Sequence, residues 1–393
     1  MQLLDIVFVI AGLALLIVGG ELLVRGASAL AQKVGISPLV VGLIVVSAAT
    51  SAPELAVTVG AVISGEPGLA VGNVVGSNIV NILFILGLSA VLVPLVVKRQ
   101  LVRFDIPVMV GMSVLLLLVS LDGQVSLVDG ALLLAGLVLH SVLSVMIGRR
   151  DASLAARRPA DFTIPSTPST GPIAIPRPVR LPLAFMFLVG GVGLLVFGAQ
   201  LLVDGAVNIA TGFGVSSLVV GLTVVAIGTS LPELAASLAA VRRKETDIAV
   251  GNIVGSNIFN IGMVLGMPAM IFGQGIPVPA PAIALDMPLM LAAAVALVPI
   301  AFTGFIVARW EGGLFVVLYV AYATYLVLAA TAHSALQGFT DVMLIFVLPL
   351  VGITLIVFAV FELGLLHGRR LARAEAARAE AARDAAAPDT AKP

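Results

Sequence analysis

Two glutamates lie inside strongly apolar segments of this chain, each within the same short motif. Glu54 ends the sequence TSAPE and Glu233 ends the sequence TSLPE. A carboxylate in a membrane-length apolar segment costs at least about 2.5–3.5 kcal/mol on insertion scales, so it requires a partner. No lysine or arginine lies in either segment. A bound cation, a proton or the other glutamate therefore remains as the partner, and a neutral glutamate that only joins helices is less favoured for two equivalent acids than for one.

Oxygen donors accompany both acids. Thr50 precedes Glu54 by four residues and Thr229 precedes Glu233 by four, so each pair shares one face of a helix. The proline before each acid lacks an N–H, which frees a backbone carbonyl one turn earlier. The motif GNxVGSNIxN follows each acid and again places a serine and an asparagine four residues apart, as Ser77 with Asn81 and Ser256 with Asn260.

This set of oxygens predicts calcium and sodium as ligands. Calcium binds six to eight oxygens from carboxylates, carbonyls and amides, whereas softer metals prefer cysteine or histidine. The chain has no cysteine, and its three histidines lie outside both motif pairs. Two carboxylates match the charge of one Ca²⁺, and the neutral oxygens suit Na⁺ equally. A site that holds either ion, but not both fully, is the physical basis of exchange.

The two motif pairs belong to a long internal repeat. Residues 39–87 align with residues 218–266 without a gap and are identical at more than half of the positions. The composition is 60% hydrophobic and 11% charged, which is far fewer charges than a soluble domain carries. The chain is therefore expected to be an all-α polytopic membrane protein. Stretches of about 20 apolar residues predict eleven spans, at 3–24, 38–63, 68–93, 104–121, 126–147, 182–203, 216–241, 247–272, 283–304, 313–331 and 341–366.

The basic residues predict the orientation of these spans. All 21 lysines and arginines fall in one set of alternating turns and tails, which the positive-inside rule makes cytoplasmic. The N-terminus is then outside and the C-terminus cytoplasmic, in an inner (plasma) membrane. Because each half has an odd number of helices, the second half inserts upside down relative to the first. A ten-helix inverted 5+5 repeat plus an eleventh C-terminal transmembrane helix is the expected fold, and such inverted repeats are typical of transporters.

The domain boundaries follow from the same count. The expected units are a first five-helix repeat (1–147), a cytoplasmic linker (148–181), a second five-helix repeat (182–331), an extra transmembrane helix (332–367) and a cytoplasmic helical or disordered tail (368–393).

The paired motifs resemble those of the calcium/cation antiporter superfamily, and within it the sodium/calcium exchanger type. The resemblance rests on TSAPE with GNVVGSNIVN and on GTSLPE with GNIVGSNIFN, and it covers roughly residues 1–331. It implies a core of the second, third, seventh and eighth helices, with the first and sixth lying across it and sliding to alternate access. The ion ligands that it implies are the side chains of Glu54, Glu233, Thr50, Thr229, Ser51, Ser230, Ser77, Ser256, Asn81 and Asn260, with backbone carbonyls of Ser47 and Ala226.

The function so implied is a secondary antiporter, not an enzyme, that exports Ca²⁺ against Na⁺ entry within the lipid bilayer. It needs no ATP, cofactor or nucleic acid, and the sequence leaves its oligomeric state open. The alternatives are a proton/calcium exchanger, a sodium-only or magnesium exchanger and, from another class, a calcium-gated channel or sensor. Proton-coupled relatives usually carry an acid in a GNAxE-like motif, whereas this chain has Thr, Ser and Pro before each glutamate.

Three positions depart from the family pattern, and several other polar residues lie outside the ligand set that it implies. Ala49 replaces the glycine seen at Gly228, Ser47 adds a hydroxyl, and both motif asparagines stand where some relatives have one aspartate, which disfavours a potassium-dependent variant. A further group of polar residues is not expected to bind the ion: Asn73 and Asn252 as caps or interhelical hydrogen bonders, Asn78 and Asn257 as support, Glu21 as an ion pair with Arg25, and Asp105, Asp204, Asp286 and Glu362 as residues near span ends, at a wet interface or a cavity mouth.

Overall fold

The computed structural model describes residues 3–156, 181–213, 226–273, 275–302 and 304–354, with 356–357, 360–361 and 364 beyond them. These residues form a helical bundle in which 9 helices, or 10 if one bent pair is a single span, are long and apolar enough to cross a membrane. The expectation of a polytopic helical membrane protein is therefore confirmed.

The first half begins with one long helix and continues through two interrupted ones. In chain order it contains α1 (Leu3–Val34), α2 (Pro38–Val40), the π-helical segment η1 (Val41–Val46), α3 (Ser47–Thr50), α4 (Ala52–Ile63), α5 (Pro67–Ile79), η2 (Val80–Leu86), α6 (Gly87–Leu92), η3 (Leu101–Asp105), α7 (Ile106–Val119) and α8 (Leu127–Ala156).

The second half repeats this order. It contains α9 (Leu181–Gly212), α11 (Ala226–Gly228), α12 (Leu231–Arg242), α13 (Thr246–Phe259), η6 (Asn260–Leu265), α14 (Gly266–Ile271), η7 (Ala282–Asp286), α15 (Met287–Phe302) and α16 (Arg309–Ala330). Two short antiparallel ladders join the halves, and they pair β1 (Leu95–Val96) with β4 (Ile306–Val307) and β2 (Gln124–Val125) with β3 (Ile276–Pro277). β1 and β3 follow equivalent helices of the two halves, as expected for an inverted repeat.

Three predicted helix ends are wrong. The fifth helix, α8, continues nine residues beyond the predicted 126–147 to Ala156, so the first residues of the predicted linker 148–181 are helical. The first helix continues ten residues beyond the predicted 3–24 to Val34, and the sixth continues beyond 182–203 to Gly212. Hydropathy marks only the apolar part of a helix, while the backbone hydrogen bonding continues through polar residues such as Arg25 and Lys33. The predicted seventh span, 216–241, lies outside the described residues over its first half.

The eleventh helix stays a prediction as a membrane span. A helix formed by α17 (Leu336–Val342), η8 (Met343–Val347) and the residues up to Thr354 is long and apolar enough to cross a membrane. Most of the remaining predicted span and the whole tail 368–393 lie outside the described residues.

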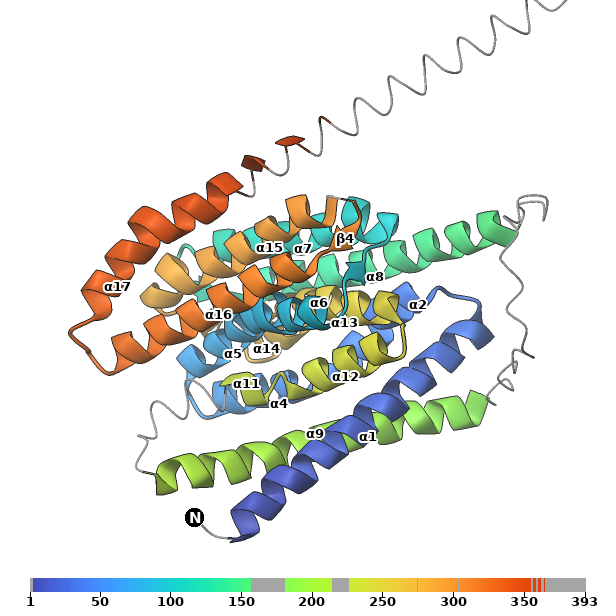
Figure 1. Cartoon of the computed structure of the whole chain (residues 1–393), viewed down its shortest axis with the longest axis horizontal. Helices are drawn as coiled ribbons and strands as arrows, with labels where there is room; N and C mark the ends of the chain where they lie inside the picture. The colour runs from blue at the N-terminus through green and yellow to red at the C-terminus, as the bar shows by residue number, and fades with distance from the viewer. Residues whose placement is uncertain are drawn as a thin grey trace, which may run out of the picture.

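The helices are arranged in layers (Figure 1). The two long helices α1 and α9 pack against each other along one side, the helices that carry the repeated motifs fill the centre, and α7, α8, α15 and α16 cover the opposite side. Glycines allow α1 and α9 to approach closely, since a Cβ on Gly191 would lie 2.6 Å from the backbone nitrogen of Leu23 and 2.8 Å from the carbonyl oxygen of Gly19. Small residues at helix contacts are the usual means of tight packing in membranes.

Candidate ion-binding site

Each motif glutamate lies in the first turn of a half-helix. The span that holds Glu54 is bent by 41° at a break before Ala52, where Ser51 leaves helical geometry with φ −81° and ψ 5°. Ser230 has nearly the same conformation, φ −90° and ψ 8°, directly before the half-helix that holds Glu233. The positive end of each half-helix dipole thus lies at its carboxylate, which favours negative charge there.

Two reciprocal hydrogen bonds connect the repeats, each from a serine of one repeat to the glutamate of the other. Ser51 Oγ donates to Glu233 Oε1 at 3.3 Å, and Ser230 Oγ donates to Glu54 Oε1 at 3.3 Å. Each serine therefore serves the acid of the other repeat. Glu54 is 1% exposed and Glu233 is fully buried. The internal symmetry of the sequence is thus expressed as a paired acidic site in the interior.

The helix that follows the second glutamate adds hydroxyl and amide groups to the same site. Ser256 Oγ donates to Glu233 Oε1 at 3.5 Å, and Thr50 Oγ1 lies 3.5 Å from Ser256 Oγ. Thr50 Oγ1 also donates to Asn252 Oδ1 at 3.2 Å. Residues of α3, α12 and α13 thus converge on one buried polar cluster.

Several buried oxygens of the predicted ligands make no hydrogen bond to any residue that the structure describes. An unpartnered buried polar atom costs about 1–3 kcal/mol, so such a group of oxygens is suited to a cation. No group of three or more His, Cys, Asp or Glu side chains that could hold a metal occurs in the described part of the chain, so neutral oxygens must complete any such site. The unbonded atoms are Glu54 Oε2, Glu233 Oε2, Ser77 Oγ, Asn81 Oδ1 and Asn260 Oδ1.

Three predicted ligands are placed less clearly. Ser47 is buried, its hydroxyl donates to the Leu43 carbonyl at 2.5 Å, and its own carbonyl accepts the Ser51 N–H at 2.9 Å. Thr229 is only partly buried. Ala226 begins the short helix α11, and its side chain is outside the described set.

Two of the four supporting asparagines, Asn73 and Asn252, join neighbouring helices. Asn73 Nδ2 donates to the Glu54 carbonyl and to Thr58 Oγ1, both at 3.0 Å. Asn252 Nδ2 donates to Ser237 Oγ at 3.3 Å. Their prediction as interhelical hydrogen bonders is confirmed, and they fix each glutamate-bearing helix to the helix after it.

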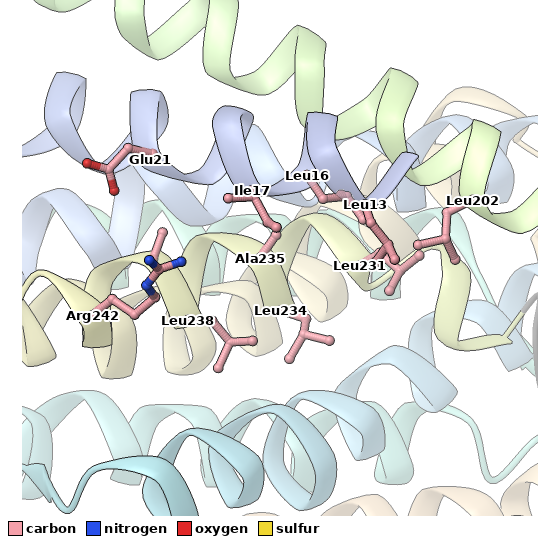
Figure 2. Close-up of a pocket in the computed structure, with 11 residues that line it drawn as sticks. Leu13, Leu16, Ile17, Glu21, Leu202, Leu231, Leu234, Ala235, Leu238 and Arg242 are labelled. Carbon is pink, nitrogen blue, oxygen red and sulfur yellow. The ribbon is translucent and has the colours of Figure 1, made fainter. Parts of the chain in front are cut away.

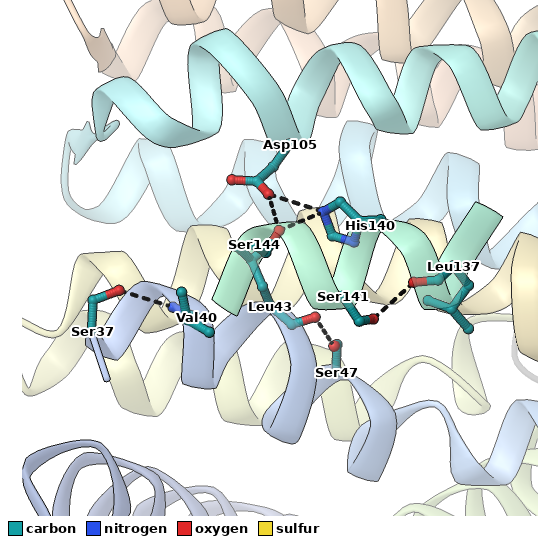
Figure 3. Close-up of polar contacts among 9 residues, drawn as sticks. All are labelled: Ser37, Val40, Leu43, Ser47, Asp105, Leu137, His140, Ser141 and Ser144. Atoms are coloured by element: carbon teal, nitrogen blue, oxygen red, sulfur yellow. Dashed lines mark hydrogen bonds and ion pairs between the residues drawn. The ribbon is translucent and has the colours of Figure 1, made fainter. Parts of the chain in front are cut away.

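The expectation that Asp105 belongs to a wet span end is wrong. Asp105 is fully buried, and its Oδ1 lies 2.9 Å from His140 Nε2 and accepts a hydrogen bond from Ser144 Oγ at 2.8 Å (Figure 3). Asp286, at the equivalent place in the second half, accepts a hydrogen bond from Tyr322 at 3.0 Å. The partners lie on another helix in both cases, so the residues next to these acids in the sequence do not mark the contacts.

Glu21 and Asp204 lie as the sequence analysis predicted. Glu21 forms the predicted pair with Arg25 at 3.0 Å and also an ion pair with Arg243. Asp204 is exposed, and Glu362 lies outside the described residues.

A groove of about 310 Å³ between α1, α9 and α12 has leucine side chains along its length and Glu21 with Arg242 at one end (Figure 2).

Comparison with known proteins identifies the family. The family model described as "Sodium/calcium exchanger protein" matches residues 4–146 and 183–328. The chain is 42% identical over 268 residues to "Putative antiporter CaxA" of Alkalimonas amylolytica (67% of this chain, 80% of that protein). It is 43% identical over 272 residues to "Inner membrane protein YrbG" of Escherichia coli strain K12 (69% and 81%).

A solved structure agrees with these relatives. The sodium-calcium exchanger NCX_Mj superimposes with a TM-score of 0.67 at 31% identity, covering 81% of this chain and 98% of that chain. The family consists of exchangers rather than enzymes, and the shared fold includes the paired-repeat core. The chain therefore belongs to the sodium/calcium exchanger protein family and is a multi-pass cation/Ca²⁺ antiporter.

Proposed function

We propose that the protein exchanges Ca²⁺ for Na⁺, with both ions binding in turn between Glu54 and Glu233. The observation that carries this proposal is the reciprocal pair of serine–glutamate hydrogen bonds, which brings the two acids to one buried place. The proposed ligand set is the one predicted from the sequence. The family description and the name of NCX_Mj, which both pair sodium with calcium, support the choice of ions.

The charge of the site explains how the two ions compete. Two carboxylates neutralise one Ca²⁺ in a region where uncompensated charge is expensive. The same oxygens also suit Na⁺, so occupation by sodium displaces calcium. Two carboxylates cannot neutralise more than two Na⁺ ions. Exchange of three or more Na⁺ for one Ca²⁺ would therefore carry net charge across the membrane.

The proposed orientation follows from the basic residues. Residues 1–147 and 182–331 are the two repeats, inserted in opposite directions, with the N-terminus outside. The linker 148–181 and the tail 368–393 are then cytoplasmic, and 332–367 is an additional span. The name of the relative YrbG supports an inner membrane location.

Flux into reconstituted vesicles tests the proposal. Wild-type protein is expected to take up ⁴⁵Ca²⁺ when vesicles are loaded with Na⁺, and Glu54→Gln or Glu233→Gln is expected to reduce this uptake to that of protein-free vesicles. Glu66→Gln is the matched control, because Glu66 is an exposed acid outside the site. Near-normal uptake by either site variant would refute the assignment.

Proton coupling is the second candidate, because each buried glutamate is able to bind a proton in place of a cation. The same vesicles separate the two. Uptake driven by a pH gradient in the absence of Na⁺, without stimulation by Na⁺, would assign protons as the counter-ion.

A further inference from the structure

Asn78 reaches from the third helix to the predicted ligand Asn260 on the eighth. Asn260 Nδ2 donates to Asn78 Oδ1 at 3.1 Å. Asn78 is itself held by its own amide nitrogen, which donates to the Asn257 backbone carbonyl at 3.3 Å and lies 3.5 Å from Met290 Sδ. All three asparagines are at most 1% exposed. The sequence assigned Asn78 no more than a supporting role, because it faces away from Ser77 and Asn81 on its own helix.

These contacts decide which end of the Asn260 amide is free. Its nitrogen is bonded to Asn78, while its Oδ1 is buried and has no hydrogen-bond partner among the described residues. Asn260 lies one turn beyond Ser256, whose hydroxyl donates to Glu233. The free oxygen thus belongs to the helix face that also supplies the glutamate site. A rotated amide would instead present its NH₂ group, which repels a cation.

The equivalent contact of the other repeat is not made. Asn257 is the counterpart of Asn78, but its Nδ2 donates to the Ile253 carbonyl of its own helix at 2.7 Å. Asn81 is the counterpart of Asn260, and neither its Oδ1 nor its Nδ2 has a partner in the described part of the chain. The amide of Asn260 is therefore held by another side chain and that of Asn81 is not, although the sequences of the two repeats match here.

We propose that Asn78 is a positioning residue that orients the Asn260 amide so that its oxygen, not its nitrogen, faces the bound cation. This inference rests on the proposed function, since it assumes that Asn260 is a ligand. It gives the second repeat a prepared amide oxygen, whereas Asn81 becomes oriented only when an ion binds. Asn78 does not contact the ion itself. Removal of its acceptor oxygen therefore weakens ion binding only through Asn260, and the steps after binding stay unchanged.

The test compares Asn78→Ala with its symmetry counterpart Asn257→Ala in proteoliposomes, with calcium as the varied ion. Loss of one hydrogen bond to a ligand is expected to raise the KM for Ca²⁺ by about 3- to 10-fold in Asn78→Ala, with kcat nearly unchanged. Asn257→Ala is expected to stay within about twofold of wild type, because that side chain bonds only its own helix. Equal changes in both variants would overturn the proposal.

Two further variants exclude a purely structural effect. Asn78→Asp keeps an acceptor for Asn260 but cannot donate to the Asn257 carbonyl, so its KM is expected to rise less than that of Asn78→Ala, and an equal rise would overturn the inference. In an Asn260→Asp background the carboxylate has two equivalent oxygens, so Asn78→Ala is expected to lose its effect on KM. A full effect in that background would also overturn it.

The titration of thermal stability with CaCl₂ supplies a readout of binding that does not depend on transport. The Ca²⁺ concentration needed for stabilisation is expected to be higher for Asn78→Ala than for Asn257→Ala and wild type. If Glu54→Gln and Glu233→Gln still bind and transport calcium normally, the proposed site itself fails. If they fail while Asn78→Ala equals wild type, only the positioning role is wrong.

Discussion

Replacement of Gly191 by alanine tests the close packing of α1 (Leu3–Val34) against α9 (Leu181–Gly212). The added methyl would lie 2.6 Å from the Leu23 nitrogen and 2.8 Å from the Gly19 oxygen, both of which are backbone atoms that cannot rotate away. The two helices must therefore separate by several tenths of an ångström. Overpacking of this kind costs about 1–3 kcal/mol, and alanine recovers up to about 1 kcal/mol of helix propensity relative to glycine.

Gly193 is the matched control on the same helix. A Cβ at Gly193 would meet no described atom within 4 Å, and the residue is exposed, so Gly193→Ala keeps only the gain in propensity. The two variants are expected to differ by about 1–3 kcal/mol in the free energy of unfolding, with Gly191→Ala less stable. Unfolding of the purified proteins in detergent micelles measures this difference. Equal stability of the two variants would refute the close approach of the helices.

Two other variants separate a buried hydrogen bond from exposed ion pairs. His140→Ala removes the imidazole partner of the buried Asp105 and is expected to cost about 1–3 kcal/mol of unfolding free energy, whereas Ser141→Ala, which removes only a hydroxyl bonded to its own helix, is expected to change little. An unfolding curve of His140→Ala equal to that of wild type would contradict the buried pair. Glu21→Gln is expected to change the same quantity by no more than about 1 kcal/mol, because its pairs with Arg25 and Arg243 are partly solvated. A loss of several kcal/mol would show that these pairs are more shielded than the structure indicates.

The sequence predicted the paired glutamates because the repeat is nearly exact around them. Two equivalent motifs in opposite orientation place residues near the middle of their spans at similar depth, which is why the sequence favours a meeting of Glu54 with Glu233. The exchange of serine donors between the repeats does not follow in the same way. Ser51 and Ser230 reach the opposite acid only because both breaks face each other, and this depends on how the helices pack.

The features that sequence analysis missed depend on contacts between distant positions. Asp105 was placed at a wet span end because hydropathy records only its neighbours in the chain, while its burial depends on His140 and Ser144. The contact from Asn78 to Asn260 was missed for a related reason. A helical wheel shows that Asn78 faces away from its neighbours, but it does not show which helix lies on that other face.

The most direct measurement of the central claim is the stoichiometry of calcium binding to purified protein at equilibrium, with and without Na⁺. A single buried site shared by both repeats predicts that Glu54→Gln and Glu233→Gln each abolish the calcium that Na⁺ displaces from wild type. Two independent sites, one per repeat, would instead leave half of that binding in each variant, and this result would contradict the account.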